Sequence, residues 1–319
     1  MRTYLTQWID TFFERSPWTN VLGLARSVLA LGTLLTLLTN SPHTLFPEST
    51  TLAAQGISSV TDVSLFRLMS NHLVVARWVA IAGLTVVVSG WRPRFTCLIH
   101  WYISFSFFSA ATAIDGGDHL ASVLSLLLVP YCLADSRRWH WLSPQAVPTN
   151  PFPLALAWVF VLLIRCQVSI IYLHAATAKV GVEDWINGTA VYYWSTHHYH
   201  GAADWIKPLV LSIMSTNLGV TLVTWGTMVL ELILFAALLI PSRDPRRKGL
   251  LWLGLSFHFS IVLVHGLISF FCSMAAALIL YLRPADSPFH LDHIRLPDFI
   301  DRVKHRISVR YRGKRKVEA

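Results

Sequence analysis

Lys179 stands at the end of a long apolar run and directly before a polar and aromatic segment. The run covers residues 153–177, and Glu183, Asp184 and Trp185 follow soon after the lysine. An amine at the end of a membrane-length helix, facing polar and aromatic groups, is typical of a catalytic base or of an ion-pair partner at the bilayer boundary. The simpler alternative is a lysine that only reaches out of the lipid to the water interface, and the residues alone favour it.

Two other polar residues precede Lys179 at regular intervals. Arg165, Tyr172 and Lys179 recur every seven residues, which places them on one face of a helix. Glu231 is the only acidic residue well inside a predicted span, so we expect it to supply the counter-charge. An ion pair between Arg165 and Glu231 that locks two helices, and a direct role of both in a site, stand as alternatives.

A second group of polar side chains forms the sequence Asp115-Gly-Gly-Asp118-His119. The glycines permit a tight turn that presents two carboxylates and an imidazole together, with His119 expected to begin the next helix. Such a group could position a proton relay or bind a cation. The alternative is that both aspartates only cap and turn the chain.

A third group is the histidine cluster that follows Trp194. His197, His198 and His200 could bind zinc or iron together with Asp115, Asp118 or His265. Adjacent residues of one segment cannot easily point at a single ion, so we predict no metal site and keep this cluster as a weak alternative. His258 and His265 lie seven residues apart on one helix face, and His265 is the better pocket candidate because it reaches the helix end.

The amino-acid composition indicates the class of protein to which these polar groups belong. Hydrophobic residues make up 54% of the 319 residues and charged residues only 13%, which is too apolar for an ordinary soluble domain. A membrane-spanning helix needs about 20 apolar residues. Eight stretches approach that length, so the sequence predicts an all-α, polytopic transmembrane bundle: residues 20–40, 72–90, 95–113, 119–134, 154–178, 209–240, 249–266 and 267–283. The four cysteines lie inside these spans without Cys-x-x-Cys spacing and are expected to be packing residues.

The placement of the net charge of +9 predicts the topology. Lys and Arg gather in alternate loops, at Arg92 and Arg94, at Arg137 and Arg138, at residues 243–248, and in the tail after Arg283. Under the positive-inside rule these loops and both termini are cytoplasmic. The basic groups therefore fit the anionic lipid surface better than nucleic acid, which we exclude as a partner. We expect a transmembrane domain over residues 1–288 and a basic cytoplasmic tail over 289–319, with an interfacial helix in residues 289–307.

The residues around Lys179 also resemble a known family. Arg165-Cys-Gln, Tyr172, Ala178-Lys179, Trp185 and Asn187-Gly-Thr-Ala-Val-Tyr-Tyr are similar to the HTTM module, the membrane domain shared with vitamin K-dependent gamma-carboxylases. The similarity is greatest to the bacterial branch named after sporulation-delaying protein B. This branch implies a multi-pass protein of the bacterial cytoplasmic membrane that acts in producing an exported peptide toxin with a small partner protein.

The resemblance also implies roles for individual residues. His119 and Lys179 would line an outward-facing pocket above a quinone site, with Lys179 as the base toward a reduced quinone. This role requires a neutral amine near pH 7, which desolvation by Trp and Tyr neighbours could provide. We therefore predict two groups of site residues. The catalytic residues are Lys179, His119, Asp115 and Asp118. The cofactor-binding residues are Arg165, Tyr172, Trp185, Tyr192, Glu231 and His265.

The chain lacks the large outward domain with which the carboxylases hold their glutamate-rich substrate, so we do not expect glutamate carboxylation itself. The leading hypothesis is maturation of an exported antimicrobial or toxin peptide at the outward-facing pocket, with a quinol as the possible cofactor. The alternative is a non-enzymatic membrane scaffold, or an export or self-protection factor for that peptide. The sequence leaves open whether the protein is an enzyme.

Overall fold

Capping side chains and glycines define where the long helices begin and end. The computed structural model describes residues 14–46, 60–142 and 150–289. Thr19 caps the first turn of α2, Asn150 caps α8 with a proline in the first helical turn, and Thr216 caps α12. Gly90 and Gly266 end α5 and α13 in the left-handed conformation. The long helices are α2 (Asn20–Thr39), α5 (Leu73–Ser89), α6 (Pro93–Ala110), α7 (Gly116–Leu133), α8 (Pro151–Val180), α12 (Asn217–Ala236), α13 (Arg246–His265) and α14 (Ile268–Leu282).

Short helices fill the connections between these elements. They are α3 (Pro42–Leu45), α4 (Leu65–Leu68), α9 (Glu183–Ile186), α10 (Ala190–Thr196) and α11 (Lys207–Met214), with single 3-10 turns at η2 (Val60–Val63), η3 (Ser70–His72) and η4 (Ala237–Leu239). The described residues contain no strand beyond one isolated bridge, between Trp91 and Trp139. The all-α prediction is confirmed.

Each of the eight predicted spans coincides with a long helix, although they differ in suitability for crossing a membrane. Six described helices, at residues 20–39, 70–89, 116–133, 151–180, 217–239 and 246–265, are long and apolar enough. α14 is apolar but shorter, and α6 is outside this set. The eight-span count and the sidedness therefore stay predictions. Large apolar side chains such as Leu162, Trp225 and Trp252 are exposed on the helix surfaces, as expected for lipid-facing positions.

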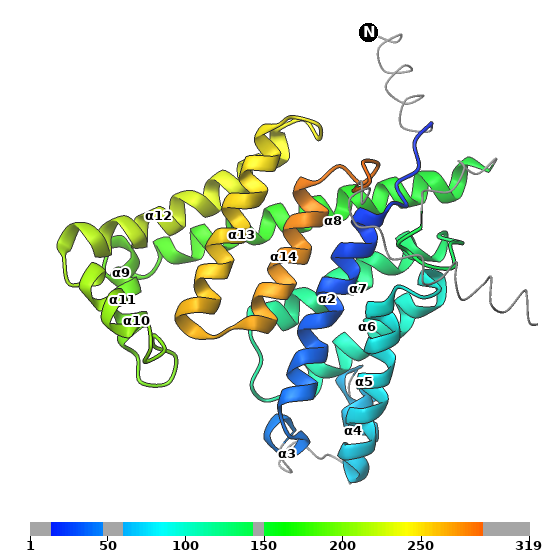
Figure 1. Cartoon of the computed structure of the whole chain (residues 1–319), viewed down its shortest axis with the longest axis horizontal. Helices are drawn as coiled ribbons and strands as arrows, with labels where there is room; N and C mark the ends of the chain where they lie inside the picture. The colour runs from blue at the N-terminus through cyan, green and yellow to red at the C-terminus, as the bar shows by residue number, and fades with distance from the viewer. Residues whose placement is uncertain (1–13, 47–59, 143–149, 290–319) are drawn as a thin grey trace, which may run out of the picture. The chain divides into compact units, whose positions relative to one another are not determined.

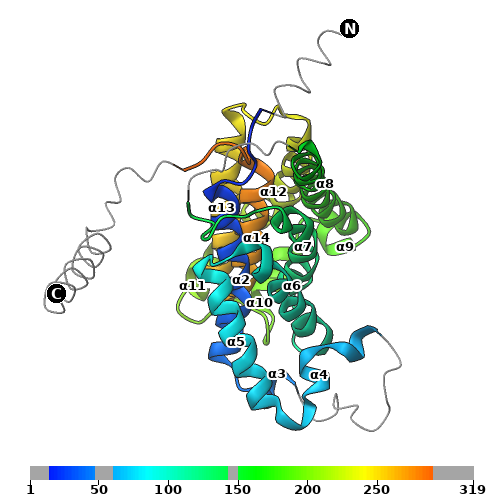
Figure 2. The ribbon, with the colours of Figure 1, turned by 90° about the vertical axis from the view of Figure 1, so that its right-hand side faces the viewer.

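The packing is organised around α2 and α14, which lie side by side in both views (Figure 1, Figure 2). Their close approach depends on Gly32, because a Cβ there would stand 3.0 Å from the backbone oxygen of Ser269. α5, α6 and α7 continue the bundle from α2, each packed on its predecessor. Three of the four free cysteines, Cys97, Cys132 and Cys272, are buried in this packing as expected.

α8 and α12 form a second packing unit, and α8 also contacts α7 and α14. In Figure 1, α8 crosses behind α13 and α14. The Ser169 hydroxyl donates to the carbonyl of Phe235, and the Tyr281 hydroxyl donates to the carbonyl of Leu234. These bonds fix the register of α8 and α14 against the C-terminal end of α12. α13 packs mainly along α14.

The loops that carry the basic residues lie together at one end of the bundle, here called the basic end. The Arg92 N–H donates to the carbonyl of Arg138, and the Thr19 hydroxyl donates to the carbonyl of Ala285. Arg243 pairs with Asp286 at the same end. The alternation of basic loops along the sequence thus corresponds to a real spatial segregation. The predicted interfacial helix of the tail lies outside the described residues.

Candidate functional site

The amine of Lys179 forms an ion pair with Glu231 across α8 and α12. Its Nζ donates to the two carboxylate oxygens of Glu231, at 2.7 and 2.9 Å, and to the carbonyl of Ala175, at 3.0 Å. The Nζ also lies 5.1 Å from the centre of the Trp185 ring. The two side chains are 19% and 8% exposed, so the pair is largely withdrawn from the surface. A cation held by a carboxylate and an aromatic face in this setting is a strong local interaction.

The alternative in which Arg165 and Glu231 form an ion pair is wrong. Arg165 donates instead to the hydroxyl of Ser242, at 2.8 Å, and to the carbonyl of Arg283, at 3.1 Å. The reason is the antiparallel register of α8 and α12. The Ser169 hydroxyl donates to the carbonyl of Phe235, so Glu231, four residues earlier on α12, lies next to the part of α8 near Lys179. Arg165 lies beyond the C-terminal end of α12, at the basic end.

The turn after α8 holds Trp185 against α12. The Trp225 indole N–H lies 3.2 Å from the carbonyls of both Trp185 and Ile186. Gly188 has φ +76°, and a Cβ there would stand 3.1 Å from the Thr221 side chain. Glycine adopts this conformation without strain, and any larger residue would also require the Thr221 side chain to shift. The Asn187-Gly188 turn therefore places the indole of Trp185 beside the amine.

Tyr172 takes part in a second buried pair, with His258 of α13. The tyrosine oxygen and the imidazole Nε2 lie 3.0 Å apart, and both side chains are buried. His258 Nδ1 is buried and has no hydrogen-bond partner among the described residues. Phe257 and Phe270 pack edge-on against the imidazole. This pair lies two turns of α8 before Lys179 and brings a third helix to the same region.

His258 is the residue that the sequence reasoning undervalued. The spacing of His258 and His265 marked one helix face, and the residue nearer the helix end was preferred for the pocket. In the structure His265 Nδ1 instead lies 2.7 Å from the carbonyl of His200, away from Tyr172. The available signal was the mid-span position of His258, because a buried imidazole in an apolar helix needs a partner.

Asp115 and Asp118 form a reciprocal cap at the start of α7. Asp115 Oδ1 accepts from the N–H groups of Gly117 and Asp118, and Asp118 Oδ2 accepts from the N–H of Asp115. This is the capping alternative, in which the carboxylates satisfy the free N–H groups of the first turn. α7 consequently begins at Gly116 and not at His119. The prediction that His119 begins the helix is wrong.

His119 and Lys179 have different surroundings. His119 is exposed, and its ring stacks on Phe108 of α6 at 4.8 Å. The contacts of Lys179 come from α8, α9 and α12. Within the described residues no bond or ring contact joins the two. Phe270 of α14 lies near residues of both regions. Its ring faces His258, and its Cα would contact a Cβ at Gly117.

The remaining predicted residues lie on the surface of the segment from α10 to α11. The imidazoles of His198 and His200 each stack on that of His197, and Tyr192 packs edge-on against Tyr193. Both tyrosines are exposed. Across the described residues, no set of three or more His, Cys, Asp or Glu side chains is arranged to hold a metal ion. The three histidines therefore form a stacked surface cluster.

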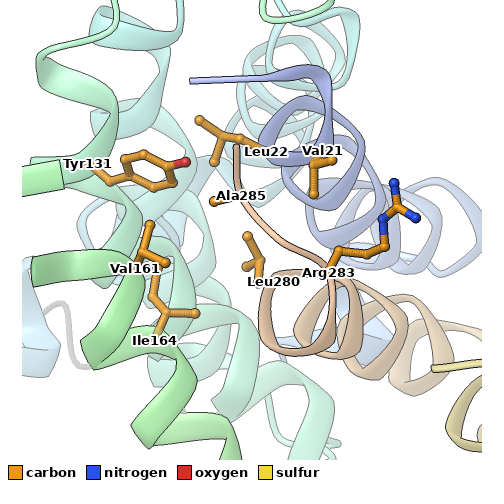
Figure 3. A pocket seen from close by; sticks show the side chains of 8 residues that line it. All are labelled: Val21, Leu22, Tyr131, Val161, Ile164, Leu280, Arg283 and Ala285. Carbon is orange, nitrogen blue, oxygen red and sulfur yellow. The ribbon is translucent and has the colours of Figure 1, made fainter. Parts of the chain in front are cut away.

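A small apolar pocket lies at the basic end, where α8 passes α2 and α14. Figure 3 shows Leu22, Val161, Ile164 and Leu280 facing one another, with the guanidinium of Arg283 turned away from them. Tyr131 lines the same pocket, but its hydroxyl donates to the carbonyl of Pro17. This pocket contains no group available for chemistry.

The Lys179–Glu231 pair is therefore the best candidate for a reactive centre. The ammonium donates all three of its N–H groups to the oxygens of Glu231 and Ala175. As a protonated amine it has no lone pair with which to act as a base. A neutral amine would arise if one proton passed from Nζ to a carboxylate oxygen of Glu231. The separation of 2.7 Å suits that transfer.

Comparison with known proteins agrees with this architecture. The HTTM domain family matches residues 22–285. The chain is 39% identical over 298 residues to the uncharacterized protein YitO of Bacillus subtilis, covering 91% of this chain and 94% of that one. It is 36% identical over 281 residues to sporulation-delaying protein SdpB of the same organism, covering 88% and 85%. No solved structure matches.

The family match covers the helices that hold Lys179, Glu231, Tyr172 and His258. Together with six helices of membrane-spanning length and composition, it makes this chain a multi-pass membrane protein. The chain belongs to the HTTM domain family, in the branch similar to SdpB.

Proposed function

We propose that this protein is the membrane component of a bacterial system that matures an exported peptide. Support comes from its similarity to sporulation-delaying protein SdpB, which extends over most of both chains. In this proposal the protein resides in the cytoplasmic membrane and acts with a small partner protein of the same system. The substrate is the exported peptide, met at the end of the bundle opposite the basic end.

The observation that carries the proposal is the ion pair between Lys179 and Glu231. Charged groups in a membrane-spanning segment cost free energy, so a partly buried pair with an aromatic neighbour is a functional-site candidate. Catalysis would begin when a proton moves from Nζ to Glu231, leaving a neutral amine and a neutral acid. The amine could then act as a base toward a hydroxyl of a bound quinol, and Glu231 could return its own proton to the product.

A reduced quinone fits the chemistry of the neighbouring residues. Trp185 offers a flat apolar face beside the amine, and His258 offers a buried nitrogen without a partner among the described residues. These groups could bind the ring and one oxygen of a quinol. Such a cofactor would supply the reducing equivalents for oxygen-dependent base formation. Lys179, Glu231 and Tyr172 would hold and move protons at that position.

The decisive experiment is mass spectrometry of the exported peptide from cells with and without this protein. We expect a mass or bond difference in the peptide, and we expect Lys179→Ala and Glu231→Gln each to abolish it at normal protein level. Lys207→Ala is the matched control, because Lys207 begins α11 outside the pair. Unchanged maturation in both site variants would contradict the proposal.

The alternative function is a non-enzymatic scaffold or export factor for the same peptide. It is favoured by the exposed aromatic side chains of the segment from α10 to α11, among them Trp194, Tyr199 and Trp205. A scaffold would tolerate Lys179→Arg and would lose peptide binding in Trp194→Ala or Trp205→Ala. An enzyme would show the opposite pattern, since arginine keeps the charge but cannot become a neutral base near pH 7.

A further inference from the structure

Arg26 is a fully buried cation on α2 that has no carboxylate partner among the described residues. Its side chain is 0% exposed, and its Nη2 donates to the hydroxyl of Thr96 on α6, at 2.7 Å. The hydroxyl of Thr96 in turn donates to the carbonyl of Trp91. Arg26 Nε and Nη1 are buried and have no hydrogen-bond acceptor among the described residues. A buried guanidinium in this condition strongly favours an additional acceptor.

Asp135, the carboxylate whose charge acts on Arg26, already forms an ion pair with Arg137. Asp135 acts on Arg26 electrostatically, but its two oxygens accept from the Nε and Nη2 of Arg137. That ion pair is almost completely buried and is neutral as a unit. The positive charge of Arg26 therefore has no direct counter-charge from this pair.

Two more polar groups without partners lie on the face of α6 that carries Thr96. His100 follows Thr96 by four residues and Ser104 follows His100 by four, so the three side chains form a stripe along the helix. All three are buried, and His100 lies within the field of the Arg26 charge. His100 Nε2 and Ser104 Oγ have no partner among the described residues. Arg26, and His100 in one tautomer, are donors that one acceptor beside Arg26 would satisfy. Ser104 lies a further turn along α6.

We propose that Arg26, with His100, binds a small monovalent inorganic anion of the chloride class between α2 and α6. The ligand is an anion because the cluster carries an unpaired positive charge and offers N–H donors. It is small because the donors are fully enclosed by helices, which excludes lipid headgroups and peptide carboxylates. The site is separate from the Lys179–Glu231 pair, since it uses α2 and α6 in place of α8 and α12.

The test is the thermal stability of the purified protein when chloride is replaced by bulky gluconate at constant ionic strength. Binding to the folded state alone raises the melting temperature in a saturable way. We expect a rise of about 5 °C when chloride exceeds its dissociation constant a hundredfold. The rise should be absent in Arg26→Met and reduced in Arg26→Lys. Arg246→Met, the same substitution at an exposed arginine, should keep it.

Two further measurements test the proposal if the Arg26→Met variant does not fold. Crystals of the wild type grown in bromide should show an anomalous peak within hydrogen-bond distance of Arg26. The double variant Cys97→Ser, Cys132→Ser should keep the chloride response, which excludes a thiolate as the counter-charge. An equal melting temperature in chloride and gluconate, or a bromide peak elsewhere only, overturns the proposal.

Discussion

Two ion pairs among the described residues, Arg137–Asp135 and Lys179–Glu231, share a distance of 2.7 Å but differ in almost everything else. Arg137 and Asp135 are two residues apart, are 2% and 0% exposed, and belong to the turn at the basic end. The guanidinium also donates to the carbonyls of His140 and Leu142. Lys179 and Glu231 lie 52 residues apart on two helices and remain partly exposed.

The difference indicates two roles for buried charge. Arg137 bonds to a nearby carboxylate and to carbonyls of its own turn, so its geometry is saturated and fixed. An arginine also cannot lose its proton in a protein. Lys179 can lose a proton, faces an aromatic ring, and has an acceptor of that proton at hydrogen-bond distance. The first pair is suited to holding a loop, and the second is suited to chemistry.

The largest expected effect follows from breaking the pair at the basic end. Asp135→Asn leaves the guanidinium of Arg137 buried without its counter-charge, and we expect a loss of about 3–5 kcal/mol in the free energy of unfolding. Denaturation of the purified protein measures this loss. Asp244→Asn, which removes the partner of exposed Arg246, should leave the denaturation midpoint unchanged. A stable Asp135→Asn protein would show that the pair does not hold the loop.

Removing both charges of the other pair should separate stability from function. In the double variant Lys179→Met, Glu231→Met, an apolar contact replaces the ion pair, so the free energy of unfolding should change by about 1 kcal/mol or less. Peptide maturation should nevertheless fall by about 100-fold or more, because the proton-transfer groups are gone. Maturation and stability are measured on the same preparation. Normal maturation in this variant would make the pair purely structural.

A smaller effect is expected at the Tyr172–His258 pair. Tyr172→Phe leaves His258 Nε2 buried without its partner, which should cost about 1–3 kcal/mol of unfolding free energy. Maturation should fall by about tenfold, and its pH profile should shift, if this pair passes protons to the site. Tyr193→Phe, at an exposed tyrosine of α10 outside the predicted cofactor-binding group, is the control. A stability loss with an unchanged pH profile would restrict Tyr172 to a packing role.

The smallest effect concerns pH at the basic end. Burial, with the nearby charges of Arg26 and Arg137, lowers the pKa of His140 from 6.5 to about 2. The folded state therefore excludes a proton that the unfolded state binds below pH 6.5. Stability is complete above that pH and falls as the pH decreases, by about 0.7 kcal/mol between pH 7 and pH 6.

His140→Gln should remove this part of the pH dependence. Its amide can replace the contact of His140 Nε2 with the Ser27 hydroxyl without titrating. Unfolding at pH 7 and pH 6 compares the variant with the wild type. An equal slope in both proteins would assign the pH dependence to other groups.

The success of the sequence analysis varied with the range of the interaction. Lys179 and Trp185 are close along the chain, so their proximity followed from a helix end and a short turn. Asp115 and Asp118 were predicted as catalytic, with capping as the alternative; the structure shows that they cap the start of α7, which depends on spacing alone. The pairing of Arg165 with Glu231 was mistaken because it required the register of two helices, and apolar helices of this kind have little pattern that fixes it.

The sequence by itself determined the all-α membrane class, the helix positions and the grouping of basic loops, because hydrophobic run length and charge placement act locally. Only the tertiary structure decided that Glu231 meets Lys179 and that His258 and not His265 meets Tyr172. It also decided that Arg26 is enclosed without a carboxylate from the part of the chain that the structure describes. Each of these depends on the rotation and register of helices distant in sequence. Side-chain packing sets those parameters, and the order of residues along one helix does not encode them.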